Sequence, residues 1–331
     1  MSHLAVAQAH DLVTRTMIRC NSSAENARPV ADALVGAELA GQTGHGLRRV
    51  LSYGAQAASG KIDGHAKPKA ERTRPGAMAI DAANGFAYPA LVLATEALPA
   101  MAREMGVAMA GLRRSHHAGA TGLFVEELAR QGLVALMLVN TPGAIAPWGG
   151  SRALFGTNPI AFAAPVPDAE PVVIDLSVSK VARGKIMAAS QRGEAIPEGW
   201  AFDAEGNPTT DPDVALQGMM APMADAKGAA LALMVELLAA GVTGARFGYE
   251  ASSFFTAEGE PPGTGQFLMA LDPRALSPEA PERIGALATA IEVQDGARLP
   301  GRRRQALRAR LEATGIPLDP DLAAQIDALG R

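Results

Sequence analysis

Residues 107–139 read VAMAGLRRSHHAGATGLFVEELARQGLVALMLV, and this stretch decides the fold class. It contains two short apolar runs, Val107–Leu112 and Leu133–Val139, with a helical stretch, Leu123–Arg130, between them. A strand, a helix and a second strand in this order are typical of a βαβ unit, in which the helix packs on a sheet of parallel strands. The stretch therefore predicts an α/β fold.

The same alternation continues on both sides of this stretch. Another helical stretch, Ala90–Met105, precedes it, and further apolar runs follow at Ile160–Ala164, Pro171–Ile174 and Gln266–Leu271. We expect one large sheet, mostly parallel or mixed, with helices packed on it. The apolar run Lys227–Ala240 predicts a buried helix that is interrupted by Glu236.

The chain begins and ends with helical patterns. Helices are expected before residue 60, and a polar, proline-bearing segment, His65–Pro75, marks the first domain boundary. A basic helix, Arg302–Glu312, is expected near the C-terminus. We predict a helical domain of residues 1–75 plus 276–331, which carries the loop around His45, and an α/β domain of residues 76–275.

Composition and charge exclude several classes of protein. With 30 basic and 34 acidic residues among 331, the net charge is −4, so no positive field attracts nucleic acid or anionic lipid. Cys20 is the only cysteine, so neither an intramolecular disulfide nor a cysteine zinc cluster can form. The histidines lack the i, i+4 pairing of a helical zinc motif, and we predict no metal site. Without a basic leader or a membrane-length apolar run, we expect a cytoplasmic protein.

Standard nucleotide and hydrolase motifs are missing, but one histidine loop stands out. The sequence contains no G-x-S-x-G elbow, no Walker loop and no G-x-G-x-x-G fingerprint. In Gly44-His45-Gly46-Leu47-Arg48-Arg49, an imidazole lies between two glycines with guanidinium groups close by. Histidine can pass a proton near neutral pH, and arginine can bind a carboxylate through two hydrogen bonds. The alternative is a turn histidine that caps a helix, with solvated arginines.

Two further segments carry candidate chemistry. Ser115-His116-His117 follows the first strand of the quoted stretch, and α/β sheets bind ligands beyond their strand ends. The alternative is a structural pair of loop histidines that bond neighbouring backbone. Arg302, Arg303 and Arg304 lie at the start of the last helix, where the helix dipole prefers anions. These cations therefore form either a phosphate site or a solvated basic end.

Together these residues resemble the malate/L-lactate dehydrogenase-like oxidoreductases, which include sulfolactate, ureidoglycolate and 2,3-diketogulonate enzymes and cyclic imino-acid reductases. The resemblance runs along nearly the whole chain and is carried by Gly156-Thr157-Asn158-Pro159, by Asp175–Ser179 followed by Gly184-Lys185-Ile186, and by Gly199-Trp200 followed by Gly206–Pro212. It implies a non-Rossmann nicotinamide-binding domain and a homodimer with its sites near the subunit interface.

The resemblance also assigns roles to individual residues. His45 matches the family's proton donor, Arg49 its substrate-binding arginine, and His117 a histidine proposed as acid or base in some members. The cofactor-contacting segments match Asn140, Thr141, Ile174, Asp175, Leu176, Ser177, Val178, Ser179, Lys180, Lys227, Pro300, Gly301 and Arg302. Two positions depart from the family pattern: Gly44 stands where serine is common, and Arg302 stands where an acidic residue is common. Because Arg302 adds positive charge, we expect NADP to be preferred over NAD.

The leading hypothesis is reversible hydride transfer between NAD(P)H and a small 2-oxo acid, giving a 2-hydroxy acid of the malate, lactate or sulfolactate type. Arg49 would anchor the carboxylate while His45 or His117 protonates the oxygen. The alternative is reduction of a cyclic imine, pyrroline- or piperideine-2-carboxylate, which needs the same arginine. A third hypothesis, a hydrolase or lyase that uses two histidines without a cofactor, predicts turnover in the absence of any nicotinamide.

Overall fold

The computed structural model describes residues 2–330, and a mixed sheet of seven strands lies at its centre. The strands lie in the order β2 (Lys69–Arg74), β3 (Ala77–Asp81), β4 (Val107–Ser115), β11 (Thr264–Leu271), β5 (Val134–Val139), β6 (Ile160–Val166) and β7 (Ala169–Leu176). Each strand that was expected from an apolar run is present, and the predicted α/β class with a mixed sheet is confirmed.

Of the two arrangements that were expected, mostly parallel or mixed, the sheet has the mixed one. Only β3 and β4 pair in parallel, and the other neighbours in this sheet are antiparallel. The quoted stretch does form strand, helix and strand, but β11 lies between β4 and β5 and pairs antiparallel with both, so that Phe267 faces Gly111 on one side and Leu138 on the other. Because β11 comes from more than a hundred residues further along the chain, the local pattern contains no sign of its insertion.

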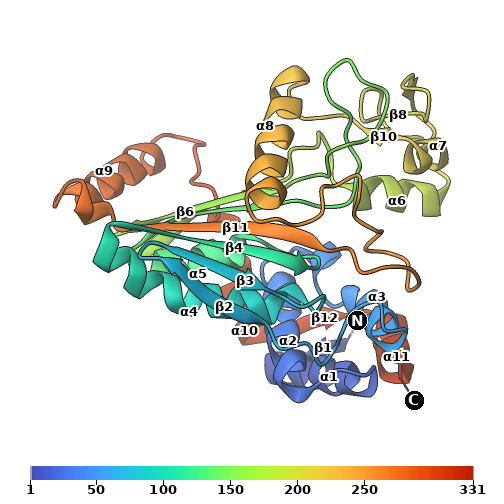
Figure 1. The fold of residues 1–331 in the computed structure, drawn as a ribbon, viewed down its shortest axis with the longest axis horizontal. Coiled ribbons are helices and arrows are strands. Elements are labelled where there is room, and N and C mark those ends of the chain that lie inside the picture. The colour runs from blue at the N-terminus through green and yellow to red at the C-terminus, as the bar shows by residue number, and fades with distance from the viewer. Residues whose placement is uncertain (1, 331) are drawn as a thin grey trace.

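Helices cover one face of this sheet, and small side chains on the sheet line the contact. α4 (Ala87–Met105) packs on β4, and α5 (Gly122–Arg130) packs on β5, β6 and β7 (Figure 1). The β4 residues on this side, Ala108, Ala110 and Leu112, are fully buried. Alanine at these positions allows the helix to approach the sheet closely, and the contact forms the centre of the main core.

The N-terminal and C-terminal segments pack together beside this layer. α1 (Val6–Arg19), α2 (Ala24–Leu39), α3 (Arg49–Ala58) and α11 (Pro320–Ala328) form one helical group, and β1 (Ser2–Leu4) pairs with β12 (Ile316–Leu318). α10 (Arg302–Thr314) contacts both α2 and β7. The two ends of the chain therefore lie close to each other, as Figure 1 shows.

The opposite face of the sheet carries helices only near its ends. α9 (Ala280–Glu292) packs on β6, and α8 (Ala226–Glu236) continues into the π-helical turn η2 (Leu237–Gly241) against β5 and β11. Beyond α8 lies a small lobe with its own core, composed of α6 (Arg183–Arg192), α7 (Pro212–Gln217) and the short strands β8 (Ala201–Phe202), β9 (Pro208–Thr209) and β10 (Met219–Met220). Figure 1 shows no helix over the part of the sheet that lies between α9 and α8.

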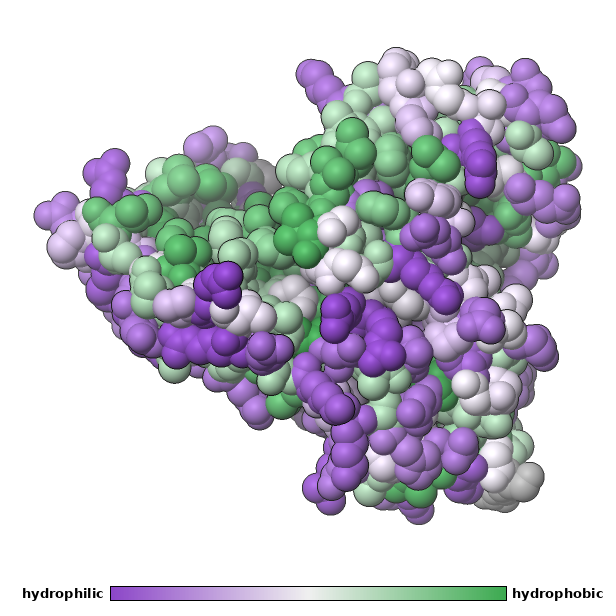
Figure 2. All heavy atoms as spheres, in the orientation of Figure 1, coloured by the Kyte–Doolittle hydropathy of each residue, from purple (hydrophilic) through white to green (hydrophobic). Residues whose placement is uncertain are grey.

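An apolar row crosses this open face. Met109, Met269, Leu136, Phe162 and Ile174 lie in register on five neighbouring strands. Met109 is 44% exposed and the other four are partly exposed. Figure 2 shows the corresponding hydrophobic surface between α9 and α8. A continuous exposed apolar surface of this kind is uncommon on a monomeric soluble protein.

Within residues 2–330, no helix is both long and apolar enough to cross a membrane. The same residues contain no group of three or more histidine, cysteine, aspartate or glutamate side chains arranged to hold a metal ion.

Candidate active site

His45 lies in a tight turn between α2 and α3. The turn contains the 3-10 helix η1 (Thr43–His45), and the Glu38 carboxylate at the end of α2 accepts the Leu47 N–H at 2.8 Å. A side chain at position 46 would collide with the Glu38 carboxylate, so the turn requires Gly46. A Cβ at position 44 would meet no atom within 4 Å outside the neighbouring residues, so Gly44 borders open space.

Arg49 begins α3 and is held on two sides. Its Nε donates to the Gly44 carbonyl at 2.9 Å, and its guanidinium carbon lies 4.9 Å from the centre of the Phe255 ring. Its two terminal nitrogens have no partner among residues 2–330. The remaining edge of the guanidinium group carries two terminal nitrogens, an arrangement that suits two parallel hydrogen bonds to a carboxylate.

The structure brings His117 against His45. Their ring centres are 5.1 Å apart and the planes differ by 26°, so the two imidazoles stack. His117 follows the end of β4, and its Nδ1 lies 2.6 Å from the Tyr53 Oη. The three residues predicted as catalytic or substrate-binding, His45, Arg49 and His117, therefore lie in one site although they come from two distant segments.

Both imidazoles are neutral at physiological pH. Burial and the nearby Arg49 cation lower the pKa of His45 to about 4, while Asp175 acts in the opposite direction. Burial also holds the pKa of His117 well below its ordinary value, and Arg49 and His45 act in the same direction. A carboxylate bound to Arg49 would offset that cation and make protonation of His45 easier.

A loop from near the end of the sheet covers the histidines. The Phe254 ring lies 5.1 Å from the His117 ring and 5.0 Å from the His116 ring. Gln56 on α3 donates to the Phe254 carbonyl at 2.7 Å and accepts from His116 Nε2 at 2.8 Å. Lys61 fixes the same loop through the carbonyls of Ser253 and Thr256. Gln56 and Lys61 were not predicted, because neither residue belongs to a recognisable motif.

Asp175 connects the catalytic loops to the C-terminal helix. Its carboxylate accepts from Gln42 Nε2 at 2.8 Å, from Thr121 Oγ1 at 2.9 Å and from Arg304 Nη1 at 3.2 Å. Gln42 precedes His45 in its turn, and Thr121 follows the His117 loop. Asp175 thus ties both histidine segments to α10, and its nearly buried side chain faces this site.

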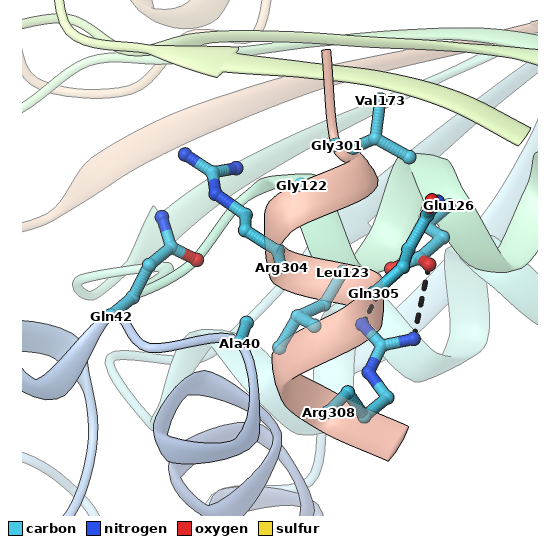
Figure 3. A pocket seen from close by; sticks show the side chains of 10 residues that line it. All are labelled: Ala40, Gln42, Gly122, Leu123, Glu126, Val173, Gly301, Arg304, Gln305 and Arg308. Atoms are coloured by element: carbon cyan, nitrogen blue, oxygen red, sulfur yellow. Dashed lines mark hydrogen bonds and ion pairs between the residues drawn. The ribbon is translucent and has the colours of Figure 1, made fainter. Parts of the chain in front are cut away.

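Two arginines at the start of α10, Arg302 and Arg304, are held in internal contacts. Arg302 Nε pairs with Glu292 at 2.7 Å, and its Nη1 donates to the Glu170 carbonyl at 2.8 Å. Arg304 extends from α10 to the side on which Gln42 lies, whereas Arg308 pairs with Glu126 (Figure 3). Gly301 has φ +94°, and a side chain there would crowd the main chain of Val173, which donates to the Pro300 carbonyl.

Asn140 and Thr141 are bound internally at the end of β5. Asn140 Nδ2 donates to the Arg246 carbonyl at 2.9 Å and to Glu236 at 3.2 Å, and its Oδ1 accepts the Gly265 N–H at 2.7 Å. Thr141 Oγ1 accepts the Thr157 N–H at 2.9 Å. The side chain of Asn140 therefore fixes loops rather than offering free donors.

Glu236 is the centre of this buried network. It is 2% exposed and accepts from the side chains of Asn140 and Asn158 and from the N–H groups of Gly156 and Gly248. Burial raises the pKa of this carboxyl group, while the four donors act in the opposite direction. Its interruption of an apolar helix in the sequence was the only signal that could have identified it.

The segment after β7 leads toward the small lobe. Ile174 and Leu176 lie on the open side of β7, and Val178 is buried in the core of the small lobe. Ser177 Oγ lies 2.6 Å from Ser179 Oγ and donates to the Thr157 carbonyl at 3.0 Å. The Lys180 N–H donates to the Ala221 carbonyl at 2.8 Å, which sets this segment beside the residues that lead into α8.

Comparison with known proteins identifies the class. The sequence pattern of the malate/L-lactate dehydrogenase family matches residues 4–327. The chain is 52% identical over 292 residues to a (2R)-3-sulfolactate dehydrogenase (NADP(+)) of Chromohalobacter salexigens, which covers 88% of this chain and 87% of that protein. The chain belongs to the malate/L-lactate dehydrogenase family and is an oxidoreductase of the dehydrogenase/reductase type.

Two further relatives belong to a different branch. A Delta(1)-pyrroline-2-carboxylate/Delta(1)-piperideine-2-carboxylate reductase of Pseudomonas putida is 40% identical over 296 residues, covering 88% of this chain and 86% of that protein. The crystal structure of delta1-piperideine-2-carboxylate reductase from Pseudomonas syringae superposes with a TM-score of 0.94 at 38% identity, covering 99% of this chain and 100% of that one. The predicted family resemblance is therefore confirmed.

Proposed function

We propose that the protein catalyses reversible hydride transfer between NADP(H) and a small 2-oxo acid, giving the 2-hydroxy acid, and that 3-sulfolactate represents the substrate class. The observation that carries the proposal is the free guanidinium edge of Arg49 beside two stacked neutral imidazoles. The 52% identity to a sulfolactate dehydrogenase supports the 2-hydroxy acid. Arg49 binds the carboxylate, which places the adjacent carbonyl carbon and oxygen beside His45 and His117.

His45 is the proposed proton donor to the carbonyl oxygen. It is half-buried, so its ring can recover a proton from solvent after each turnover. In the oxidation direction the neutral imidazole accepts the hydroxyl proton. Asp175 supports the positive form of the ring electrostatically, while Arg49 and Arg304 oppose it.

The residues present fit a nicotinamide dinucleotide. Lys180 and Lys227 are both exposed, and neither forms an ion pair among residues 2–330. The Ser179 and Pro222 main chains form a bridge, so the segment that carries Lys180 runs beside the approach to α8, whose first turn carries Lys227. Unpaired cations at a helix N-terminus favour phosphate groups. We propose that these two lysines hold the cofactor, which supplies the hydride when bound.

We expect NADPH to be used more efficiently than NADH, and an Arg302→Glu substitution to reduce that preference by about tenfold or more. A carboxylate at this position would repel the 2′-phosphate that NADPH carries and NADH lacks. The measurement is the ratio of kcat/KM for the two cofactors.

Because Arg302 pairs with Glu292, the matched control is Glu292→Gln, which releases the arginine without reversing its charge. An unchanged ratio in Arg302→Glu would show that Arg302 has no part in cofactor selection. A lower ratio in Arg303→Glu alone would transfer the role to Arg303, which is exposed.

Reduction of a cyclic imino acid is the second candidate. It is supported by the structural match to the piperideine-2-carboxylate reductase and by the Phe254 and Phe255 rings beside the histidines and Arg49. These rings offer an apolar wall for a five- or six-membered ring. The substrate carboxylate would bind Arg49 in the same way.

A substrate panel separates the candidates. NADPH and NADH oxidation should be measured with 3-sulfopyruvate, oxaloacetate and pyruvate and with pyrroline- and piperideine-2-carboxylate. We expect the highest kcat/KM with 3-sulfopyruvate. A higher value with either imine would replace the first candidate by the second. Conversion of a substrate without nicotinamide would contradict both and favour a hydrolase or lyase that uses the two histidines.

We further propose that a second copy of the chain covers the apolar row on the open sheet face, so that the protein is a homodimer. The row spans five strands and is flanked by α9 and α8 (Figure 2). In α9, Leu287 is 65% exposed and can pack against the partner chain. A water-exposed apolar surface of this extent is unfavourable in a monomer.

In this account the wild type elutes with the mass of two chains, and Met109→Lys weakens dimerisation by at least about 10²-fold, because it buries an unpaired charge. Size-exclusion chromatography with light scattering measures both. The control is Ile18→Lys, a similarly exposed position on α1. A Met109→Lys protein that remains dimeric at the same concentrations would place the interface elsewhere.

We also propose the division into residues 1–75 with 276–331 and residues 76–275. The packing of α1, α2, α3 and α11 supports the helical part, whereas α9 packs on β6 of the sheet. The single buried thiol, Cys20, is consistent with our proposal of a reducing cytoplasm.

A further inference from the structure

A buried row of hydroxyl groups leads away from His117. The Tyr53 Oη lies 2.6 Å from His117 Nδ1 and 3.0 Å from the Tyr88 Oη. Both tyrosines are fully buried, and the Tyr88 hydroxyl has no other hydrogen-bond partner among residues 2–330. The row therefore begins at the imidazole and ends at Tyr88, inside the core.

The number of protons in this row selects one arrangement. If Tyr88 donates to Tyr53 and Tyr53 donates to His117 Nδ1, every hydroxyl proton is used. If His117 Nδ1 carries the proton and donates to Tyr53, Tyr53 donates to Tyr88, and the Tyr88 proton is left buried without an acceptor. A buried donor without a partner is unfavourable. The first arrangement leaves Nδ1 without a proton, so the ring proton is on Nε2.

We propose that Tyr53 is a positioning residue that, with Tyr88 donating to its oxygen, holds His117 as the neutral tautomer with its proton on Nε2. In this state His117 donates a hydrogen bond to the reacting oxygen or nitrogen of the substrate, while His45 alone transfers a proton. The inference rests on the proposed function and assigns separate roles to the two histidines of that site.

The surroundings of His117 exclude the alternative in which it acts as the acid. Arg49, His45 and His116 face its ring, and the Arg49 cation opposes a second proton on it. Passing the Nε2 proton to substrate would draw a proton from Tyr53 and then from Tyr88, leaving a buried phenolate. Burial raises the pKa of Tyr53 to about 12 and that of Tyr88 well above its ordinary value, so this relay has no source of protons.

The other end of the ring is free for substrate. His117 Nε2 has no hydrogen-bond partner among residues 2–330. This nitrogen is also not fully buried. The neighbouring His116 differs, because its Nε2 is bound to Gln56 and its Nδ1 is buried. His117 is therefore the histidine of this pair that can present a donor to the site.

Nitrogen NMR of the full-length protein with ¹⁵N-labelled histidine tests the tautomer directly. We expect the His117 signals, assigned by their loss in His117→Gln, to show a protonated Nε2 and an unprotonated Nδ1 from pH 6 to 9. In Tyr53→Phe, Nδ1 loses its hydrogen-bonding partner, so neither tautomer is favoured and a mixture of the two should appear. In Tyr88→Phe, the Tyr53 hydroxyl can still donate to Nδ1, so the proton should stay on Nε2. The exposed Tyr249 provides the matched control, Tyr249→Phe, which should leave these signals unchanged.

Kinetics supply the second readout. Tyr53→Phe should lower kcat by about 3–10-fold while the KM for the cofactor and the slope of the pH profile stay unchanged, because it removes the partner of Nδ1 itself. Tyr88→Phe should have a smaller effect on kcat, because the Tyr53 hydroxyl still donates to Nδ1. A wild-type ring protonated on Nδ1, or one that titrates between pH 6 and 9, would overturn the inference and leave the proposed reaction intact. Nε2 protonation together with no nicotinamide turnover on any probe would overturn the proposed function alone.

Discussion

Replacing His45 by alanine should lower kcat for 2-oxo acid reduction by about 10²–10⁴-fold and leave cofactor affinity nearly unchanged. The imidazole is the proposed source of the proton that reaches the oxygen as the hydride arrives at carbon. Its turn is held by the contact between Glu38 and the Leu47 N–H, which does not involve the imidazole, so the fold should persist. Steady-state kinetics and cofactor titration measure the two quantities separately.

The pH profile provides a second signature of His45. Since the pKa of His45 in the free enzyme is about 4, the fraction protonated falls tenfold for each pH unit above that value. The kcat/KM for reduction should therefore fall with a slope of −1 above about pH 4. The kcat/KM for oxidation needs the neutral ring and should fall only below that pH.

These effects should be specific to His45. The slope of the reduction profile should vanish in His45→Ala, and the exposed His65 gives the control, His65→Ala, which should behave as wild type. Nearly normal turnover in His45→Ala, together with a collapse in His117→Ala, would transfer the acid and base role to His117. That outcome would also contradict the assignment of His117 as a fixed hydrogen-bond donor.

Arg49→Lys should raise the KM for the 2-oxo acid by about 10–100-fold while the KM for NADPH stays within about twofold. Lysine keeps the charge near His45 but cannot form two parallel hydrogen bonds with a carboxylate. Its ammonium group would also lose the planar contact with Phe255 and the bond from Nε to the Gly44 carbonyl. The same panel of substrates and cofactors provides the measurement.

Arg48 offers a matched control, since it is the preceding residue and is exposed. Arg48→Lys should change neither KM. A loss of NADPH affinity in Arg49→Lys at an unchanged KM for the 2-oxo acid would show that Arg49 does not bind the substrate carboxylate.

The elements of the fold could be predicted from the sequence, but their pairing could not. Apolar runs and helical stretches identify β4, α5 and β5 to within a few residues, because these patterns follow the local period of the chain. β11 was recognised as a strand, yet its position between β4 and β5 depends on contacts across more than a hundred residues. That insertion, together with the antiparallel pairs β2–β3, β5–β6 and β6–β7, makes the sheet mixed rather than mostly parallel.

In the candidate site, too, some residues could be predicted from local sequence and others depend on tertiary packing. His45, Arg49 and His117 occur in short, glycine-bearing segments, and the structure brings them together as the sequence suggested. Tyr53 and Tyr88 belong to ordinary helical patterns, and only tertiary packing sets their hydroxyls in a row behind His117. In the arginine cluster the sequence favoured Arg302, whereas Arg304 is the residue that reaches Asp175 and the catalytic loops.

The most direct test of the central claim follows the hydride itself. The protein should be incubated with 3-sulfopyruvate and NADPH carrying deuterium at both hydrogens of the nicotinamide C4, and the product examined by mass spectrometry. We expect one deuterium on C2 of the resulting 3-sulfolactate, with one oxidised cofactor formed for each product molecule. Product that forms without deuterium on carbon, or that forms equally well without the cofactor, would contradict the claim that this site performs hydride transfer.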